Sequence, residues 1–219
     1  DESALEKEID ELVKTLKEHS KNLSSERKKA AKKLDESISK ELRELGMSQA
    51  RFETSFEKKY DHSFSSNGSD RVEFMISENP GQPLRPLVKI ASGGELSRVM
   101  LAIQTILTTD TVETLIFDEV DTGISGSVAD TVGRKLANLG ERQQTLCITH
   151  LPQIAAFAEH HYAVTKSTEN DQTYTFIEDL DKQQAITEIA RLLDGSEITN
   201  QALKLAREMR KRSHSISTN

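Results

Sequence analysis

The sequence predicts an α/β protein in which a mainly parallel sheet is flanked by helices and is preceded by a long N-terminal coiled-coil helix. Apolar residues recur at heptad spacing through residues 1–46, and no proline interrupts them. Two short apolar runs enclose one helical segment, which is the order of a parallel crossover. A chain of 219 residues with 35% hydrophobic residues can also bury one sizeable core.

The first segment, residues 1–46, is predicted to be a coiled-coil helix surrounded by Lys and Glu. Its apolar seam consists of Leu5, Ile9, Leu12, Leu16, Leu23, Leu34, Ile38, Leu42 and Leu45. A single helix cannot bury such a stripe alone, and no complementary segment is visible in the sequence. We therefore expect a partner segment or another chain to cover it, and we expect Gly46 to be the C-cap.

Residues 47–219 are expected to form the second domain. The pattern of apolar runs and turn residues predicts a series of elements. In chain order these are a hairpin of residues 51–60 and 71–77, a proline-rich loop at 78–86, a helix from Ser92, a strand at 114–119, a helix at 127–139, a strand at 144–150, strands at 162–166 and 174–180, helices at 184–193 and 199–212, and a disordered tail at 213–219.

Bulk composition excludes some classes of protein. The formal charge of −7 argues against a wholly basic nucleic-acid binder, although residues 21–40 carry seven Lys or Arg against three acids and residues 204–212 are also basic. Both runs fit either phosphate contacts or solvated helix faces. The single Cys147 permits no internal disulfide, and no apolar run is long enough to span a membrane or resembles a signal peptide. We expect a cytoplasmic protein.

The stretch VKIASGGELSRVMLAIQTI places Ser92, Gly93 and Gly94 at the start of a helix. A helix N-terminus carries unpaired N–H groups and a partial positive charge, and glycine lets an anion approach the backbone closely. The candidate ligand is a phosphate. A serine N-cap followed by two loop glycines explains the same residues equally well.

Two acids, Asp118 and Glu119, close the apolar strand TLIF, and His150 closes the next strand. Ligands of open parallel sheets bind beyond the carboxyl ends of the strands, so we expect these three residues to lie together at that end of the sheet. One carboxylate can hold Mg²⁺ while the other orients or deprotonates an attacking water. The alternatives are two solvated acids at a strand end and a structural histidine.

These three motifs together resemble the ATP-binding-cassette ATPases. ASGGELSR resembles their signature motif, LIFDEVDTG their Walker B strand and D-loop, and ITHLPQIAAFA their switch-histidine segment. A coiled coil beside these motifs is similar to the SMC-like branch, and in particular to its bacterial DNA-repair members. The resemblance covers essentially the whole chain and implies the C-terminal lobe of an ATPase head of this type.

The resemblance implies a role for each motif residue. Ser92, Gly93 and Gly94, with Glu95 beside them, would contact the γ-phosphate of ATP held by the opposite head. At the acidic strand end, Asp118 would support Mg²⁺ and Glu119 would be the catalytic base. The remaining assignments are Asp121 as the D-loop residue of the dimer interface and His150 as the switch histidine that contacts the γ-phosphate.

No GxxxxGK[ST] motif occurs in the chain, so the resemblance implies that an N-terminal half-head carries the P-loop. We expect ATP hydrolysis only in the full-length protein, with a homodimer of heads, DNA as a partner inferred from the resemblance, and a role in DNA double-strand-break repair and recombination. The alternatives are a chromosome-organising SMC or another repair ATPase head, a transporter cassette, and an inert coiled-coil scaffold.

Overall fold

The computed structural model describes residues 2–58, 65–107, 112–169 and 172–216. The chain divides into two compact units. Unit 1 comprises residues 1–43 and 47–90, and unit 2 comprises residues 44–46 and 91–219. The boundary at residue 46 between a coiled-coil domain and an α/β domain stays a prediction. No helix among the described residues combines the length and the hydropathy needed to cross a membrane.

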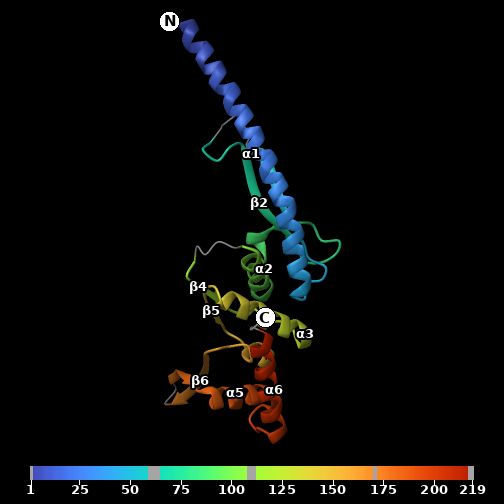
Figure 1. The fold of residues 1–219 in the computed structure, drawn as a ribbon, viewed down its shortest axis with the longest axis vertical. Helices are drawn as coiled ribbons and strands as arrows, with labels where there is room; N and C mark the ends of the chain where they lie inside the picture. The colour runs from blue at the N-terminus through green and yellow to red at the C-terminus, as the bar shows by residue number, and fades with distance from the viewer. Residues whose placement is uncertain (1, 59–64, 108–111, 170–171, 217–219) are drawn as a thin grey trace. The chain divides into compact units, whose positions relative to one another are not determined.

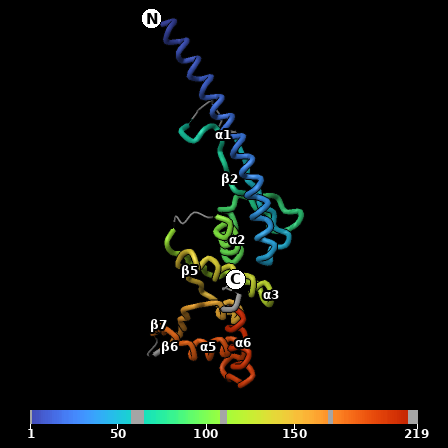
Figure 2. Tube along the Cα trace, in the orientation of Figure 1, coloured from blue at the N-terminus to red at the C-terminus, as the bar shows by residue number. Residues whose placement is uncertain are grey.

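Helix α1, Glu2–Glu44, is the blue helix at the N-terminal end of the chain in Figure 1 and Figure 2. Gly46 follows it with a φ of 82°, as expected of a glycine C-cap. The apolar seam is exposed in its N-terminal part, where Leu5 and Leu12 are 60% and 57% exposed, whereas Ile38 is buried. The helix is thus confirmed, and its pairing with another segment stays a prediction.

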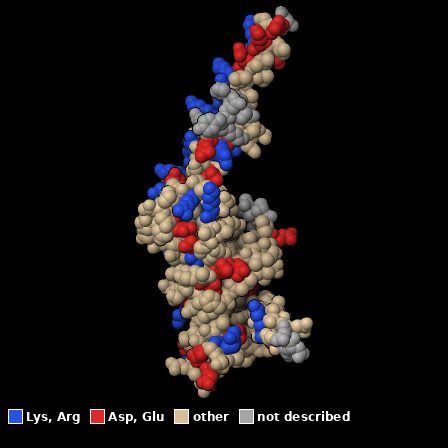
Figure 3. All heavy atoms as spheres, turned by 180° about the vertical axis from the view of Figure 1, so that it is seen from behind, with Lys and Arg blue, Asp and Glu red and all other residues tan. Residues whose placement is uncertain are grey.

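Charged side chains follow α1 along its length. Figure 3 shows Lys and Arg recurring along the part of the molecule that carries this helix, with Asp and Glu between them. The exposed lysines of the basic run are Lys21, Lys28, Lys29, Lys32, Lys33 and Lys40. This surface is a solvated helix face, and it also offers cations to an anionic partner.

Unit 1 also contains the predicted hairpin, of which residues 59 and 60 lie outside the described part of the chain. Strand β1, Arg51–Lys58, pairs antiparallel with β2, Asp70–Ser77. The proline-rich loop differs from the prediction, because Arg85–Pro86 forms the short strand β3 against β2 before the 3₁₀ turn η1, Leu87–Lys89. Proline is tolerated there because β3 lies at the edge of the sheet, where its missing N–H is not needed.

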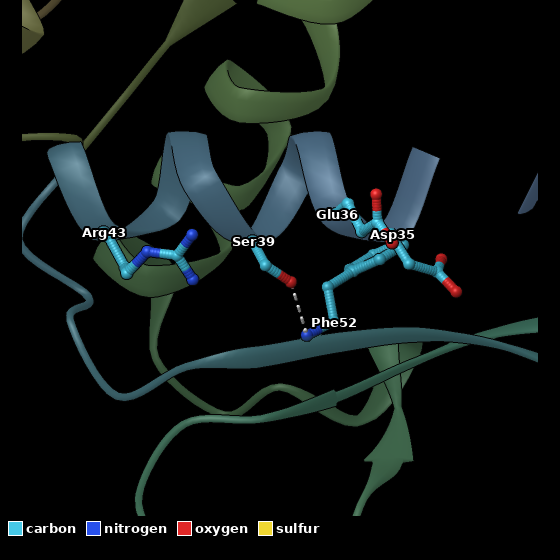
Figure 4. Close-up of a pocket in the computed structure, with 5 residues that line it drawn as sticks. All are labelled: Asp35, Glu36, Ser39, Arg43 and Phe52. Carbon is cyan, nitrogen blue, oxygen red and sulfur yellow. Dashed lines mark hydrogen bonds between the residues drawn. The ribbon is translucent and has the colours of Figure 1, made fainter. Parts of the chain in front are cut away.

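Side chains of α1 hold β1 through its backbone. Asp35 accepts hydrogen bonds from the Thr54 backbone N–H at 3.1 Å and from its hydroxyl at 2.7 Å. The Ser39 hydroxyl accepts from the Phe52 N–H at 3.4 Å, which is the dashed line in Figure 4. Glu36 and Arg43 line the same shallow hollow. The hollow is lined by both acidic and basic side chains. The hydrogen bonds around it attach β1 to α1.

Unit 2 contains the predicted parallel crossover. The elements in chain order are helix α2, Gly93–Ile106, strand β4, Thr114–Phe117, helix α3, Gly126–Gly140, and strand β5, Gln144–Cys147. Strands β4 and β5 pair in parallel, with Phe117 opposite Cys147. The carboxyl ends of both strands therefore lie at the same edge, as the sequence predicts.

In the residues that the structure describes, the rest of unit 2 consists of one hairpin and three helices. In chain order these are α4, Pro152–Ala155, β6, His161–Glu169, β7, Gln172–Leu180, α5, Lys182–Asp194, and α6, Asn200–Ile216. Small buried alanines such as Ala190 and Ala206 let α5 and α6 pack closely. The tail prediction is wrong for residues 213–216, because α6 continues through them and Ser213 donates a hydrogen bond to the Ala156 carbonyl at 2.7 Å. Residues 217–219 of that prediction lie outside the described residues.

Candidate functional site

The predicted glycine turn, residues 92–94, lies at the start of α2. Ser92 is the N-cap, and its hydroxyl accepts a hydrogen bond from the Glu95 N–H at 3.4 Å. Ser92 and Gly93 are exposed, whereas Gly94 is buried. The serine cap thus forms as the capping preferences predict, and the first residues of the turn remain accessible to a ligand.

The glycine turn lies against the acidic turn, residues 118–122. A Cβ atom added at Gly93 would clash with Oε2 of Glu119, and a Cβ added at Gly94 would lie 2.9 Å from the Glu119 carbonyl oxygen and from Cβ of Thr122. Neither position has room for a side chain while the two turns keep these places. Gly94 is therefore required for a close approach between two backbone segments, whereas Gly93 leaves space for the Glu119 side chain.

Glu119 occupies an unusual backbone conformation, with a φ of 56°. Left-handed residues other than glycine are uncommon and cost roughly 1–3 kcal/mol unless their surroundings hold them. Two hydrogen bonds hold this one, from the Glu119 N–H to Oδ1 of Asp118 at 2.9 Å and from the Thr122 N–H to the Glu119 carbonyl at 3.0 Å. The sequence carries no signal for this conformation, and such outliers concentrate at functional sites.

Asp121 joins the acidic turn to the end of β5. Its carboxylate is 4% exposed, and Oδ2 accepts hydrogen bonds from the Thr149 hydroxyl at 2.6 Å and the His150 N–H at 2.9 Å. The same oxygen lies 3.0 Å from Nδ1 of His150, whose side chain is 73% exposed. These donors compensate the buried carboxylate and hold the imidazole at the sheet edge.

The structure brings the predicted site residues into one cluster of unit 2. Gly93 and Gly94 contact the acidic turn, and Asp121 contacts His150. The Ser92 hydroxyl instead bonds within its own turn. Reasoning from the sequence missed Thr149, whose position directly before His150 was the only signal, and the residues of α2 that bond the acidic turn, namely Ser97 and Arg98.

The donor set at the end of β4 suits Mg²⁺. Asp118 and Glu119 are exposed and offer carboxylate oxygens, the ligands that this hard cation prefers. Among the residues that the structure describes, no cluster of three or more His, Cys, Asp or Glu could hold a metal ion. Magnesium at nucleotide sites commonly uses one or two carboxylates, with phosphates and water as the other ligands, so the pair fits that arrangement.

Cys147 ends β5 close to these acids and is half-buried rather than fully buried. Burial, together with the nearby charges of Asp121 and Asp118, raises the pKa of its thiol to about 12. The thiol is therefore protonated at neutral pH and is not a nucleophile.

This pKa predicts slow alkylation of Cys147 by iodoacetamide. At pH 8 the thiolate fraction of a thiol with a pKa of about 12 is roughly a thousandfold below that of a thiol with the ordinary value of 9. Mass spectrometry of the native chain and of the chain in urea measures the ratio. Asp121→Asn should speed the native reaction by removing a charge that disfavours the thiolate. Alkylation rates of the native and the unfolded chain within tenfold of each other would contradict the raised pKa of Cys147.

Comparison with curated proteins identifies relatives of this chain. It is 48% identical over 209 residues to the DNA repair protein RecN of Vibrio cholerae, covering 94% of this chain and 37% of that protein. It is 39% identical over 229 residues to RecN of Bacillus subtilis, covering 98% of this chain and 40% of that protein. The chain thus spans about two fifths of the length of these relatives. No protein-family model matches the sequence.

Among solved structures, the chain is similar to an Smc head domain with a coiled coil and joint from Pyrococcus yayanosii. The TM-score is 0.54 at 19% identity, covering 85% of this chain and 34% of that one. At this identity the likeness concerns the fold alone. It confirms the predicted α/β architecture of an SMC-type head lobe with an N-terminal helix, and the RecN relatives confirm the resemblance to bacterial DNA-repair proteins.

Proposed function

Since this chain is related to the RecN DNA repair proteins over nine tenths of its length, we propose that it forms the C-terminal lobe of an SMC-like ATPase head that acts in DNA double-strand-break repair and recombination. The observation that carries the proposal is the buried Asp121, which ties the acidic turn to His150. In the full-length protein, ATP binding drives two heads together and hydrolysis releases them. Localisation in the bacterial cytoplasm, at the nucleoid, belongs to the same proposal.

The proposal gives each cluster residue a task at the phosphates. Asp118 holds Mg²⁺, which neutralises charge on the transferring phosphoryl group. Glu119 orients and deprotonates the attacking water, and His150 contacts the γ-phosphate from the end of β5. Asp121 keeps the imidazole in place and borders the interface between heads. Such catalysis is mainly positioning and charge compensation, which suits residues locked by backbone hydrogen bonds.

Ser92, Gly93, Gly94 and Glu95 act on the ATP of the opposite head in this proposal. The accessible helix start supports the assignment, because its partial positive charge favours a phosphate. In this chain the Glu119 side chain lies against Gly93. A phosphate held by a second head would therefore have to displace the Glu119 carboxylate from Gly93.

The exposed face of the β4–β5 pair supports a missing lobe. Ile116, Leu146 and Ile148 are 67%, 42% and 60% exposed. Parallel strands are almost always covered on both faces, so such a face requires a cover. We assign that cover to the N-terminal half-head, which carries the P-loop and its lysine and supplies most of the affinity for ATP.

DNA is the proposed macromolecular partner. The relatives are DNA repair proteins by name, and the exposed lysines of α1 offer a surface for phosphates. The overall charge of −7 confines any such contact to local patches.

Co-expression with the N-terminal half tests the proposed function. We expect the 219-residue chain alone to turn over no ATP and to bind it weakly, because the phosphate cradle lies in the other half. The assembled head should hydrolyse ATP, and DNA should change its rate. Micromolar ATP binding by this chain alone in calorimetry would contradict the proposal that the N-terminal half supplies the phosphate cradle. An assembled head without turnover would contradict the assigned activity.

A further inference from the structure

Arg98 is a buried cation on α2, one helical turn beyond the glycine turn. The residue is 7% exposed. One guanidinium nitrogen donates hydrogen bonds to the Val120 carbonyl at 3.3 Å and to the Thr122 carbonyl at 2.7 Å. Val120 and Thr122 directly precede and follow Asp121, so one side chain holds the backbone on both sides of that residue.

Burial of this guanidinium has a cost. Desolvation lowers the pKa of Arg98, while the charges of Glu95 and Asp121 partly offset the shift. Its buried Nε has no hydrogen-bond partner among the residues that the structure describes. A leucine at this position would fill the interior without that penalty. The cation is therefore explained by what it bonds, not by packing.

The neighbouring residue bonds the other end of the acidic turn. The Ser97 hydroxyl donates to the Asp118 carbonyl at 2.6 Å. Consecutive residues of α2 thus hold backbone carbonyls at both ends of residues 118–122. Gly94 completes the contact, because its Cα faces the Glu119 carbonyl and Cβ of Thr122 without a side chain between them.

We propose that Arg98 is a positioning residue that fixes the glycine turn and the acidic turn as one unit. This inference rests on the proposed function, in which the glycine turn serves the ATP of the opposite head while Glu119 and Asp121 serve the ATP of their own head. Arg98 then couples the two nucleotide sites of an engaged pair. A displacement of the glycine turn by one phosphate moves the Glu119 backbone at the other site.

Steady-state kinetics of the assembled head test the role of Arg98. Arg98→Met should lower kcat by about 10- to 100-fold, because misplacement of the acidic turn by a fraction of an ångström has effects of this order. KM for ATP should stay within about threefold, since Arg98 touches no phosphate in the proposal. Arg98→Lys, which keeps the charge and can reach one carbonyl, should recover part of the rate.

Arg142→Met is the matched control. Arg142 is exposed and precedes β5, at the sheet edge opposite the candidate site. Its replacement should leave kcat and KM unchanged. A kcat of Arg98→Met equal to that of the wild type, in protein with an unchanged melting temperature, would overturn the inference.

Hydrogen exchange provides a readout that needs no ATP turnover. The Thr122 amide is bonded to Glu119, and the His150 amide to Asp121. Both should exchange faster in Arg98→Met and Arg98→Lys than in the wild type or in Arg142→Met. Unchanged exchange of the Thr122 and His150 amides in both Arg98 variants would overturn the inference. Faster exchange in the Arg98 variants, in a head whose wild-type form has no ATPase activity, would support the positioning role of Arg98 and reject the proposed function.

Discussion

Glu119→Gln is expected to abolish ATP turnover in the assembled protein and to leave ATP-bound heads engaged. Glutamine keeps the size of the side chain and its contact with the glycine turn, but it cannot accept a proton from water. Loss of a general base typically lowers a rate by about 10²- to 10⁴-fold. Binding of ATP uses other groups, so engagement of the heads should persist while their release is lost.

The measurement pairs an ATPase assay with light scattering in the presence of ATP and Mg²⁺. Glu113→Gln is the matched control, because Glu113 is also exposed but lies just before β4, at the far end of that strand. It should behave as the wild type. If Glu119→Gln hydrolyses ATP at the wild-type rate, Glu119 is not the base. Indifference of both turnover and dimer formation to Glu119→Gln would favour the inert scaffold.

The sequence predicts the elements of the site because each element has a local signal. Ser92 is an N-cap by residue type, and the apolar run before Asp118 ends where the chain must turn. The placement of His150 beside the acidic residues follows from one parallel crossover. These inferences need only periodicity, capping and strand order.

The contacts within the site could not be predicted in the same way. The left-handed φ of Glu119 is held by hydrogen bonds within the acidic turn, with Asp118 and Thr122, and glutamate has no preference for that conformation. The bond from Thr149 to Asp121 depends on the register between β4 and β5. In the sequence Arg98 is one of the two charged residues of α2, with Glu95, and only its burial against the acidic turn distinguishes it.

The two glycines of the glycine turn are expected to give different phenotypes when replaced by alanine. At Gly93 the added Cβ meets the end of the Glu119 side chain, which can swing aside. The free energy of unfolding should therefore change by less than about 1 kcal/mol, a usual range for a site that can adjust. The displaced carboxylate is the proposed base, so ATP turnover should fall by about 10-fold or more.

At Gly94 the added Cβ meets the Glu119 backbone and Cβ of Thr122, both at 2.9 Å, and neither is the end of a flexible side chain. The acidic turn must shift, and overpacking of this kind costs about 1–3 kcal/mol of stability. Gly94→Ala should thus lower both the free energy of unfolding and the turnover of the folded protein.

Urea unfolding of the chain and ATPase assays of the assembled head separate these expectations. Gly140→Ala is the control, because Gly140 ends α3 with open space around it, and alanine there should be neutral or slightly stabilising. Equal losses of stability at positions 93 and 94 would mean that the Glu119 side chain is as rigid as its backbone. Full turnover in Gly93→Ala would remove Gly93 from the site, because no base or phosphate could then depend on the space that this glycine leaves open.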